Sequence, residues 1–473
     1  MGYPLAAGSE ATGVAADPSV FDVLVIGGGI SALALTKSLH ESDPALRIML
    51  VERTDRLGGK IRTEDFCGKR VDVGPEGFVA RTDGVAALCR SAGLEEQLVA
   101  PVGAAPMICL GGKLRPIPPG IIGGVVTRPW VAARSGLLSW RGMVRAAWDL
   151  VLPSRQPDDD VSIGDLVTER MGREVTDSIV SPLIGGIYAG DVYRMSAAAC
   201  APQLGKAMAS GKGLVRGSVV GATGGTGGFF TLSSGMATLV ERLGQQLEGV
   251  GISLGSPAHS LRKTGSTWTL GAGTGSVEAR SVFICTPPAQ TAVLLAESAP
   301  ATADCLRQID SVPVAIVLLA YERAGFERLP VSSGFVVAPS EKTLLTACTF
   351  VSAKWPHMTD SAPFIVRCSV GRDQDRRGME LGDPELVAAV DLELRKVAGI
   401  TTPPMQSRVI RWDSGMIQFR PGHRQLVARA RALLPSGLSL LGEGYDGVGL
   451  ASCVDKAHSA ARELLPYTGA ASR

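Results

Sequence analysis

The chain has 473 residues, 45% of them hydrophobic and 19% charged, and a formal net charge of +2. A chain of this length exceeds one compact core and predicts two or three domains. The balanced charge and the lack of zinc-finger, homeodomain or RNP-like motifs argue against a nucleic-acid partner. No apolar run reaches the length that spans a bilayer.

Cysteine usage and the N-terminal segment predict a cytoplasmic protein. The nine cysteines are scattered singly without a CxxC pair, which indicates reduced thiols. The five histidines show no ligand spacing, so no metal site is expected. Residues 1–20 lack the basic and apolar regions of a signal peptide and are expected to form a disordered leader. Residues 467–473 are expected to form a short tail.

The first folded segment is typical of a dinucleotide-binding strand–turn–helix. Residues 21–34 read FDVLVIGGGISALA, an apolar strand that ends in glycines and leads into apolar residues at helical spacing. Backbone N–H groups at such a helix start bind a pyrophosphate. Glu52 closes the next apolar strand, at the spacing where a carboxylate accepts from ribose hydroxyls. The predicted contacts are Gly27, Gly29, Ile30, Ser31, Ala32, Glu52 and Arg53.

A second glycine pair follows this strand directly. Gly58 and Gly59 stand between Arg56 and Lys60, where a backbone that lies against a second phosphate or a flavin ring cannot carry side chains. The alternative is a glycine-rich loop that makes a tight connection. The combination of both glycine motifs resembles the amine-oxidase-like flavoprotein superfamily. The resemblance implies FAD as cofactor, with Gly58, Gly59 and Lys60 among its contacts.

Later segments are needed to complete the cofactor sheet, because one βαβ unit cannot cover both faces of a parallel sheet. The stretch 231–288 contains a helix pattern and the apolar strand SVFICTPP, LSLLGEG reads as a further strand, and 446–465 as a helix. The expected fold class is α/β: a Rossmann-type FAD-binding domain built from three separated segments, an α+β substrate domain and an inserted helical subdomain. The expected boundaries are 21–88, 226–290 and 411–466 for the FAD-binding domain, 89–118 and 291–410 for the substrate domain, and 119–225 for the helical subdomain.

One stretch of the middle segment is basic and rich in tryptophan. Residues 97–148 contain no Asp or Glu but include Trp130, Trp140 and Trp148. A predicted helical face carries Trp140, Met143, Val144, Ala147 and Val151, with Arg141 and Arg145 off that face. Such a helix suits the headgroup layer of an anionic membrane, which would place the protein peripherally on the inner face of the cell membrane. An ordinary core helix with solvated arginines is the other interpretation, and both stay open.

Further motifs are particular to one branch of the superfamily. In chain order they are DVGPEGFVAR (72–81), PLIGGIYAGD (182–191), GGFFTLSSGMATLVERL (227–243), KWPH (354–357), RWDSGMIQFRPGH (411–423) and GEGYDGVGLASC (442–453). Together, from about residue 21 to 465, they resemble the oxygen-dependent porphyrinogen oxidases of haem synthesis, bacterial type. The resemblance implies a six-electron oxidation of a porphyrinogen by dioxygen, with hydrogen peroxide formed. Coproporphyrinogen III is favoured as substrate, and protoporphyrinogen IX is the alternative.

The resemblance also implies site residues. Gly74 and Pro75 would border the flavin ring, and the C-terminal block would close over the pyrophosphate and the ring; its residues are Gly442, Glu443, Gly447, Val448 and Gly449. Arg81 would meet a propionate, Phe350 would pack on the macrocycle, and Gly185 and Gly186 would let the backbone approach it. The alternatives are a solvated cation, a core aromatic and a turn. Lys354, Arg194 or Lys206 could supply further cations.

The chain departs from the branch at Thr82, Ile417, Phe419 and Glu443. An acid at position 443, close to the expected phosphates, is unfavourable unless it turns outward or is paired. No protein side chain is assigned as catalytic, because the flavin carries the redox chemistry. Transfer of the product to a ferrochelatase and formation of a homodimer stay open as partners.

Two rival functions share the fold. An amine oxidase or a desaturase of the superfamily is the first, but the strand SVPVAIVLLAYE (311–322) lacks the lysine that amine oxidases place near the flavin. The second rival is a non-redox binding protein, as in the GDP-dissociation inhibitors of small GTPases. Those proteins lack an intact flavin site, whereas this chain keeps nearly all of it.

Overall fold

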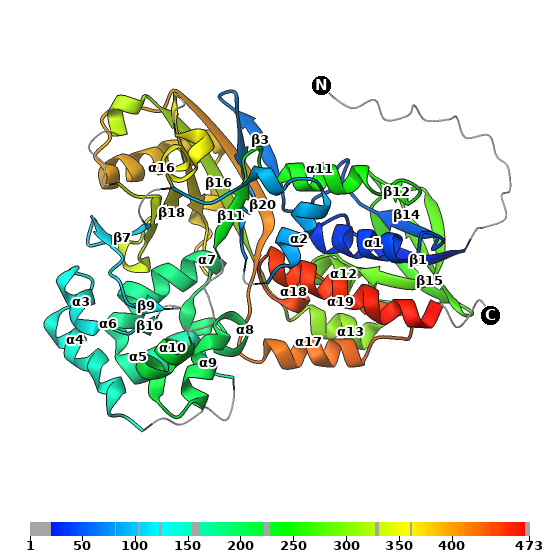
Figure 1. Ribbon diagram of the computed structural model, residues 1–473, viewed down its shortest axis with the longest axis horizontal. Helices are drawn as coiled ribbons and strands as arrows, with labels where there is room; N and C mark the ends of the chain where they lie inside the picture. The colour runs from blue at the N-terminus through cyan, green and yellow to red at the C-terminus, as the bar shows by residue number, and fades with distance from the viewer. Residues whose placement is uncertain are drawn as a thin grey trace.

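The computed structural model describes residues 20–80, 82–102, 105–122, 125–153, 160–221, 228–326, 331–359 and 362–468. The expected tail from residue 469 and all but the last residue of the expected leader lie outside these ranges. Figure 1 shows one lobe built on the N-terminal strand, a second lobe built on another sheet, and a group of short helices beside the second sheet.

The first sheet is mainly parallel and has the order β12-β2-β1-β15-β14-β13, with β21 paired to β15. Its strands come from three separated parts of the chain, which confirms the expected α/β class. The pairs β12–β2, β2–β1, β1–β15 and β15–β21 are parallel, while the pairs β13–β14 and β14–β15 are antiparallel. The strands are β1 (Phe21–Ile26), β2 (Ile48–Val51), β12 (Gly251–Ser253), β13 (Ala258–Thr264), β14 (Thr267–Ala272), β15 (Gly275–Ile284) and β21 (Leu438–Leu440).

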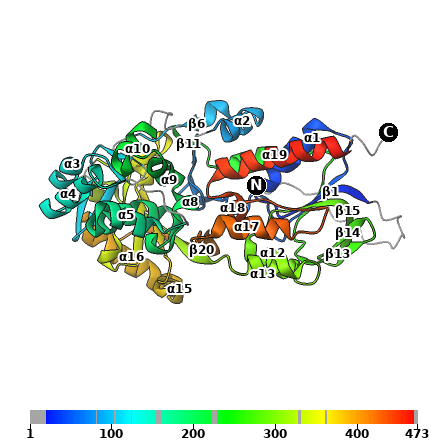
Figure 2. The same ribbon diagram turned by 90° about the horizontal axis from the view of Figure 1, so that it is seen from below.

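Helices cover both faces of this sheet, as Figure 2 shows. Because side chains alternate along a strand, Val23 and Val25 of β1 pack against one helical layer, and Leu24 and Ile26 pack against the other. The first layer contains α1 (Ile30–Ser42), α2 (Gly84–Ser91), α11 (Ala237–Gln245) and α19 (Leu450–Thr468). The second contains α12 (Pro288–Leu294), α13 (Pro300–Leu306) and α17 (His423–Ala432).

The second sheet has the order β20-β16-β19-β18-β17-β7-β8. One face packs under α16 (Asp383–Ala398), and the other packs against the hairpin β3 (Thr63–Phe66) and β4 (Lys69–Asp72). This second face therefore looks toward the segment that follows β4. The strands are β7 (Met107–Leu110), β8 (Lys113–Pro116), β16 (Ser311–Tyr321), β17 (Gly334–Val337), β18 (Leu345–Thr349), β19 (Phe364–Val370) and β20 (Gln406–Ile417).

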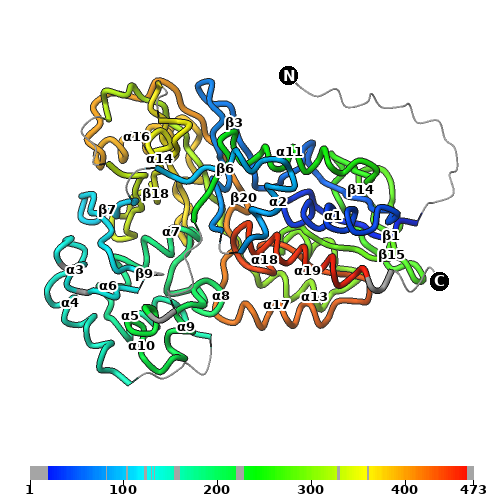
Figure 3. Tube along the Cα trace, in the orientation of Figure 1, coloured from blue at the N-terminus to red at the C-terminus, as the bar shows by residue number. Residues whose placement is uncertain are grey.

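Short helices and a two-stranded sheet fill the middle segment, and Figure 3 shows these helices grouped together beside β7. The helices share one apolar core. No helix in the described part of the chain is both long and apolar enough to cross a membrane. The strands of this segment are β9 (Ile121–Ile122) and β10 (Val125–Val126). Its helices are α3 (Pro129–Arg134), α4 (Trp140–Ala147), α5 (Ile163–Met171), α6 (Arg173–Val175), a π-helical segment (Thr176–Gly185), α7 (Gly186–Tyr188), α8 (Ala197–Cys200), α9 (Pro202–Ala209) and α10 (Gly213–Gly221). A separate three-stranded sheet consists of β5 (Phe78–Val79), β11 (Phe229–Leu232) and β6 (Leu98–Val99).

The structure differs from the expected boundaries in four places. Residues 411–417 lie in β20 and pair with β16, so they belong to the second sheet. Residues 291–309 pack on the first sheet through α12 and α13, because their apolar faces complete its second helical layer. The expected helix at 446–465 is interrupted by Gly447 and Gly449, both at positive φ, and α19 begins only at Leu450. The expected basic helix ends at Ala147, before Val151.

Candidate functional site

The two glycine turns lie directly against each other. The N–H of Gly58 donates to the carbonyl of Gly28 at 2.8 Å. A Cβ on Gly59 would lie 3.2 Å from the Cα of Gly29, and a Cβ on Gly28 would lie 2.9 Å from Leu57 Cδ2. The absence of side chains therefore lets the two turns form one continuous backbone surface at the carboxyl end of β1.

Glu52 is oriented by the same turn. Its side chain is 8% exposed. Its Oε2 accepts from the N–H of Gly28 at 2.7 Å, and its Oε1 accepts from the N–H and the hydroxyl of Thr54 at 2.9 and 2.7 Å. A carboxylate offers about four acceptor positions and these contacts use three of them, so Oε2 can accept one further hydrogen bond, from a ribose hydroxyl. Arg53 is exposed, whereas Ser31 and Ala32 are buried.

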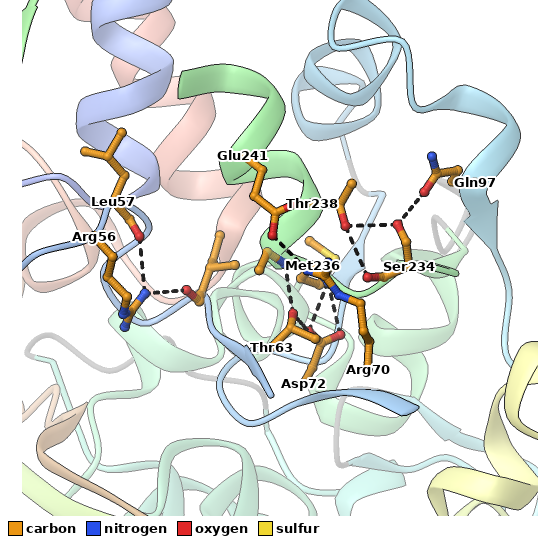
Figure 4. Close-up of polar contacts among 12 residues, drawn as sticks. Arg56, Leu57, Thr63, Arg70, Asp72, Gln97, Ser234, Met236, Thr238 and Glu241 are labelled. Carbon is orange, nitrogen blue, oxygen red and sulfur yellow. Dashed lines mark hydrogen bonds and ion pairs between the residues drawn. The ribbon is translucent and has the colours of Figure 1, made fainter. Parts of the chain in front are cut away.

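Arg56 organises the second glycine turn, a role that the sequence analysis did not assign. Its guanidinium donates to the carbonyls of Leu57, Ile61 and Gly59 at 3.2, 3.1 and 2.7 Å, and Figure 4 shows the contact with Leu57. Three carbonyls turned toward one cation fix the path of the loop. An arginine immediately before LGG was the only signal in the sequence.

The C-terminal glycine block closes the surface from the other side. Lys60 Nζ lies 2.6 Å from Glu443 Oε2 and donates to the carbonyl of Gly415 at 2.8 Å. The departure at position 443 is thus paired. A Cβ on Gly442 would lie 3.8 Å from Ser31 Oγ, which places this block beside the start of α1.

These glycines leave a stretch of backbone that side chains do not cover, referred to below as the groove, and a dinucleotide fits its chemistry. A Cβ on Gly29 or on Gly449 would meet no atom within 4 Å. Gly442, Gly447 and Gly449 have φ values of +125°, +105° and +104°, which a side chain would strain. Two helices, α1 and α19, begin at this groove, and free N–H groups at helix starts favour a pyrophosphate.

The Gly74–Pro75 segment continues the groove toward the second sheet. A Cβ on Gly74 would lie 1.8 Å from the carbonyl oxygen of Lys60, so no other residue fits there. The indole N–H of Trp412 donates to the carbonyl of Val73 at 3.0 Å, and Arg367 donates to the carbonyl of Gly74 at 2.9 Å. The second sheet therefore holds this segment by two side chains that the sequence analysis did not single out.

Asp72 anchors the segment from its other end, as Figure 4 shows. Its carboxylate accepts from the N–H of Met236 at 2.9 Å and from the hydroxyl of Thr63 at 2.5 Å. Thr63 Oγ1 in turn accepts from the N–H of Ala237, so both side chains cap the start of α11. Burial raises the pKa of Asp72 to about 7, although both hydrogen bonds oppose this shift.

The expected substrate contacts are only partly brought together. Arg81 lies outside the described residues. Phe350 is 2% exposed and packs against Phe326, Phe335 and Phe364. This placement contradicts a ring that packs on a ligand and corresponds to the core alternative, because three other aromatic rings already cover it.

The glycine pair has two different environments. A Cβ on Gly185 would lie 2.8 Å from the carbonyl of Gly190, so its smallness serves the local turn. Gly186 is exposed, and the adjacent Ile187 is 64% exposed. Together Ile187 and Gly186 form a small exposed apolar surface, which was not among the expected substrate contacts.

The three further cations differ in availability. Lys354 lies 3.1 Å from Glu76 and over the rings of Phe229 and Trp355, so its charge is already used within the protein. Arg194 is 40% exposed and lies 3.2 Å from Asp373. Lys206 is exposed on α9. Within the described ranges, no cluster of His, Cys, Asp and Glu could hold a metal ion.

Known proteins resemble the chain over almost all of its length. A family model described as flavin containing amine oxidoreductase matches residues 31–465. The coproporphyrinogen III oxidase of Bacillus subtilis (strain 168) is 32% identical over 94% of this chain and 98% of its own. That of Mycobacterium tuberculosis (strain ATCC 25618 / H37Rv) is 33% identical over 93% and 96%. A crystal structure from Exiguobacterium sp. 255-15 has a TM-score of 0.86 and 30% identity, and the match covers 94% of this chain and 99% of the other.

The family match and the groove without side chains agree on the cofactor. The two glycine turns and the C-terminal block leave Gly29 and Gly449 free of neighbouring atoms, as a dinucleotide site requires, and the family contains flavin. The chain belongs to the flavin containing amine oxidoreductase family, and its cofactor is FAD.

Proposed function

We propose that the protein oxidises coproporphyrinogen III to coproporphyrin III in haem biosynthesis, with dioxygen as acceptor and hydrogen peroxide as co-product. The similarity to two coproporphyrinogen III oxidases at above 30% identity, over more than nine tenths of each chain, carries this proposal. Protoporphyrinogen IX is the alternative substrate.

The residues that would hold FAD follow from the groove. The start of α1 (Gly27, Gly29, Ile30, Ser31, Ala32) would meet the pyrophosphate, and Glu52 the ribose, with Arg53 at the rim. Gly58, Gly59 and Lys60 would line the second turn. Gly74 and Pro75 would border the ring, and Gly442, Glu443, Gly447, Val448 and Gly449 would close over it. The N-terminus of α19 directs its dipole toward this block, which favours negative charge there.

FAD, when bound, supplies the two-electron acceptor for each of the three rounds that convert a porphyrinogen to a porphyrin. The protein has to hold a meso carbon of the substrate in an aligned pose beside the ring and exclude bulk water. Formation of the aromatic macrocycle favours the reaction, so a strong general base is not required. The uncovered side chain of Ile187 beside Gly186 suits an apolar macrocycle.

The substrate carboxylates require cations beside the bound macrocycle. Arg81 stays the first proposed partner. Of the three further candidates, Lys354 is held by Glu76, whereas Arg194 is exposed and adjoins the IYAGD segment. Asp373 also contacts Arg420 at 2.7 Å, and Arg420 in turn lies 3.5 Å from Asp310, so the charges of this cluster balance. We assign the second carboxylate contact to Arg194 because its side chain is 40% exposed, whereas that of Lys354 is 15% exposed.

A peripheral attachment to the inner face of the cell membrane is proposed from the exposed tryptophans. Trp130, Trp140 and Trp148 are 54%, 68% and 55% exposed, and Val151 is 80% exposed. They lie on α3, on α4 and just after α4, elements that contact one another. Arg141 lies 5.4 Å from the ring centroid of Trp140, so cations and aromatic rings share this surface, as an anionic headgroup layer requires. Transfer of product to a ferrochelatase and a homodimer stay predictions.

The rival functions predict different outcomes in one experiment. Purified protein is examined for flavin absorbance and then supplied with coproporphyrinogen III and protoporphyrinogen IX, with porphyrin fluorescence as readout. Bound flavin and faster turnover of coproporphyrinogen III are expected. A colourless protein that does not take up FAD would support the non-redox rival, and a flavoprotein inactive on both porphyrinogens would support another oxidase or a desaturase. Amine oxidation is disfavoured because β16 contains no lysine.

A further inference from the structure

Arg367 occupies a place where a charged residue is unusual. It lies on β19, a central strand of the second sheet, opposite Leu318 of β16 and Thr349 of β18. Its neighbour two residues earlier, Ile365, belongs to the core that packs the sheet against Val73. Since residues i and i+2 share a face, Arg367 points toward the Gly74–Pro75 segment.

The guanidinium of Arg367 is incompletely paired. Nη2 donates to the carbonyl of Gly74 at 2.9 Å. Nε is buried and has no hydrogen-bond partner, and no ion pair to Arg367 occurs among the described residues. Arg367 is half-buried, so its incompletely paired charge is partly withdrawn from water. Because such a charge is costly to bury, an anion or a developing negative charge beside it is favoured.

The neighbouring charges do not neutralise it. Glu76 is within hydrogen-bond distance of Lys354 Nζ at 3.1 Å and of Thr349 Oγ1 at 3.3 Å. Burial disfavours the charged Glu76, but the cations of Lys354 and Arg367 outweigh burial and lower its pKa. One carboxylate thus faces two cations. The charge of Arg367 also acts on the next acid, Asp72, but that carboxyl group is hydrogen-bonded to Met236 and Thr63, and burial raises its pKa to about 7.

We propose that Arg367 is a positioning residue that holds an incompletely compensated positive charge against the Gly74–Pro75 segment and so stabilises the reduced, negatively charged flavin. This inference rests on the proposed function, in which that segment borders the ring. Addition of two electrons and one proton to the neutral oxidised ring leaves one negative charge, and a nearby cation in a medium of low dielectric constant favours that state. The cation therefore raises the midpoint potential of the bound flavin.

The test is the midpoint potential of the bound flavin, measured by equilibrium reduction against a reference dye. Arg367→Gln is expected to lower the potential by at least 30 mV, which is about a tenfold shift for a two-electron couple. Arg367→Lys, which keeps the charge, is expected to recover most of this loss. Glu76→Gln removes the opposing carboxylate and is expected to shift the potential in the other direction.

Arg408 provides the matched control. It lies on β20, opposite the same Leu318, and is paired with Glu64 at 2.9 Å. Glu64 is shared with Arg62 at 2.6 Å, so Arg408, like Arg367, competes with a second cation for one carboxylate. Arg408→Gln should nevertheless leave the potential at the wild-type value, because Arg408 donates to the carbonyl of Asp65 and not to the Gly74–Pro75 segment. If Arg367→Gln does not fold, the midpoint potentials of Glu76→Gln and Arg367→Lys still test the proposal.

Three results would overturn the inference: an Arg367→Gln potential equal to that of the wild type, a Glu76→Gln shift to a lower potential, or a change in KM for the porphyrinogen without any change in potential. The last would make Arg367 a substrate contact. If the wild-type protein binds no FAD, the proposed function itself fails, and this outcome is distinguished before any variant is made.

Discussion

Lys60 and Glu443 form an ion pair of 2.6 Å that joins the second glycine turn to the C-terminal block, 383 residues along the chain. The side chains are 32% and 22% exposed, so the pair is partly shielded from water. An acid near a pyrophosphate would repel it, but here the acid is held by a lysine that also donates to the carbonyl of Gly415. The pair therefore fastens the two walls of the groove together and offsets the charge of Glu443.

Replacement of Glu443 separates these two effects. Glu443→Gln should lower the free energy of unfolding by about 1 kcal/mol, because the pair is only partly buried. FAD affinity should stay equal or increase, since the released Lys60 charge then faces the pyrophosphate. Chemical denaturation and FAD titration measure the two quantities. Lys60→Met is the control and should lose both stability and affinity; loss of FAD in Glu443→Gln would contradict the assigned geometry.

Gly29 tests the groove directly. It has φ −74° and ψ 177°, which alanine adopts without strain, and its Cβ would meet no protein atom. Gly29→Ala should therefore fold with wild-type stability but bind FAD at least tenfold more weakly, about 1.4 kcal/mol, because the methyl group occupies the approach of the pyrophosphate. Gly205→Ala on α9, also without neighbours, should leave FAD affinity unchanged. Equal FAD affinity in both variants would place the pyrophosphate elsewhere.

Asp72 predicts a specific pH dependence of stability. Its pKa is raised by burial from 3.8 to about 7 in the folded protein. Between these values the folded state binds more protons than the unfolded state, so the contribution of Asp72 to stability falls as the pH rises from about 4 to about 7. Asp72→Asn keeps a neutral oxygen for the Met236 N–H and removes the titration.

The measurement is the difference in unfolding free energy between Asp72→Asn and the wild type at several pH values. From pH 4 to pH 7 the variant should gain a few kcal/mol on the wild type, because one proton released on unfolding changes the free energy by about 1.4 kcal/mol for each step of one in pH. Above pH 7 the difference should be constant. A difference independent of pH would show that the carboxyl group is ionised throughout in the folded protein.

The cofactor groove was predictable because its signals are local. The strand, the glycines and Glu52 lie within about thirty residues, and each one's role follows from backbone geometry that does not depend on distant packing. That strands at 281–284 and 438–440 complete the sheet of β1 was equally accessible, because one βαβ unit cannot cover both faces of a parallel sheet.

The remainder depended on contacts between distant segments. Arg367 and Glu76 are 291 residues apart, and nothing in either local sequence indicates that they meet. Phe350 carries an aromatic ring in a motif of the family, but its burial is decided by Phe326, Phe335 and Phe364 from other strands and loops. The boundary at residue 411 was misplaced because β20 is one continuous strand whose pairing with β16 runs to Ile417.

Arg194 should distinguish the two porphyrinogens. Coproporphyrinogen III carries four carboxylates and protoporphyrinogen IX carries two, so a second cationic contact benefits the former more. Arg194→Ala should raise KM for coproporphyrinogen III about tenfold, the equivalent of one charge-assisted hydrogen bond of about 1.4 kcal/mol, and change KM for protoporphyrinogen IX less. The expected kcat is unchanged. Arg173→Ala is the control, because Arg173 is also an exposed arginine of the helical middle segment and is paired with Asp177. Equal effects on both substrates would remove Arg194 from the substrate site.

The exposed tryptophans predict binding to anionic vesicles. Trp140 and Trp148 lie on one short helix and its following turn. Two acids that adjoin this helix are already paired: Asp149 is buried against Arg170 at 2.6 Å, and Glu174 accepts from Ser139 at 2.8 Å. Cosedimentation with vesicles that contain phosphatidylglycerol should be strong at low salt and weak with neutral phosphatidylcholine, because the arginines and the rings act together.

The double variant Trp140→Ser/Trp148→Ser should lose most of this vesicle binding. The variant should still fold, because both side chains are exposed in the folded protein. Retained turnover in that variant, with vesicle binding lost, would separate attachment from catalysis; vesicle binding equal to that of the wild type would assign this surface to a protein contact instead.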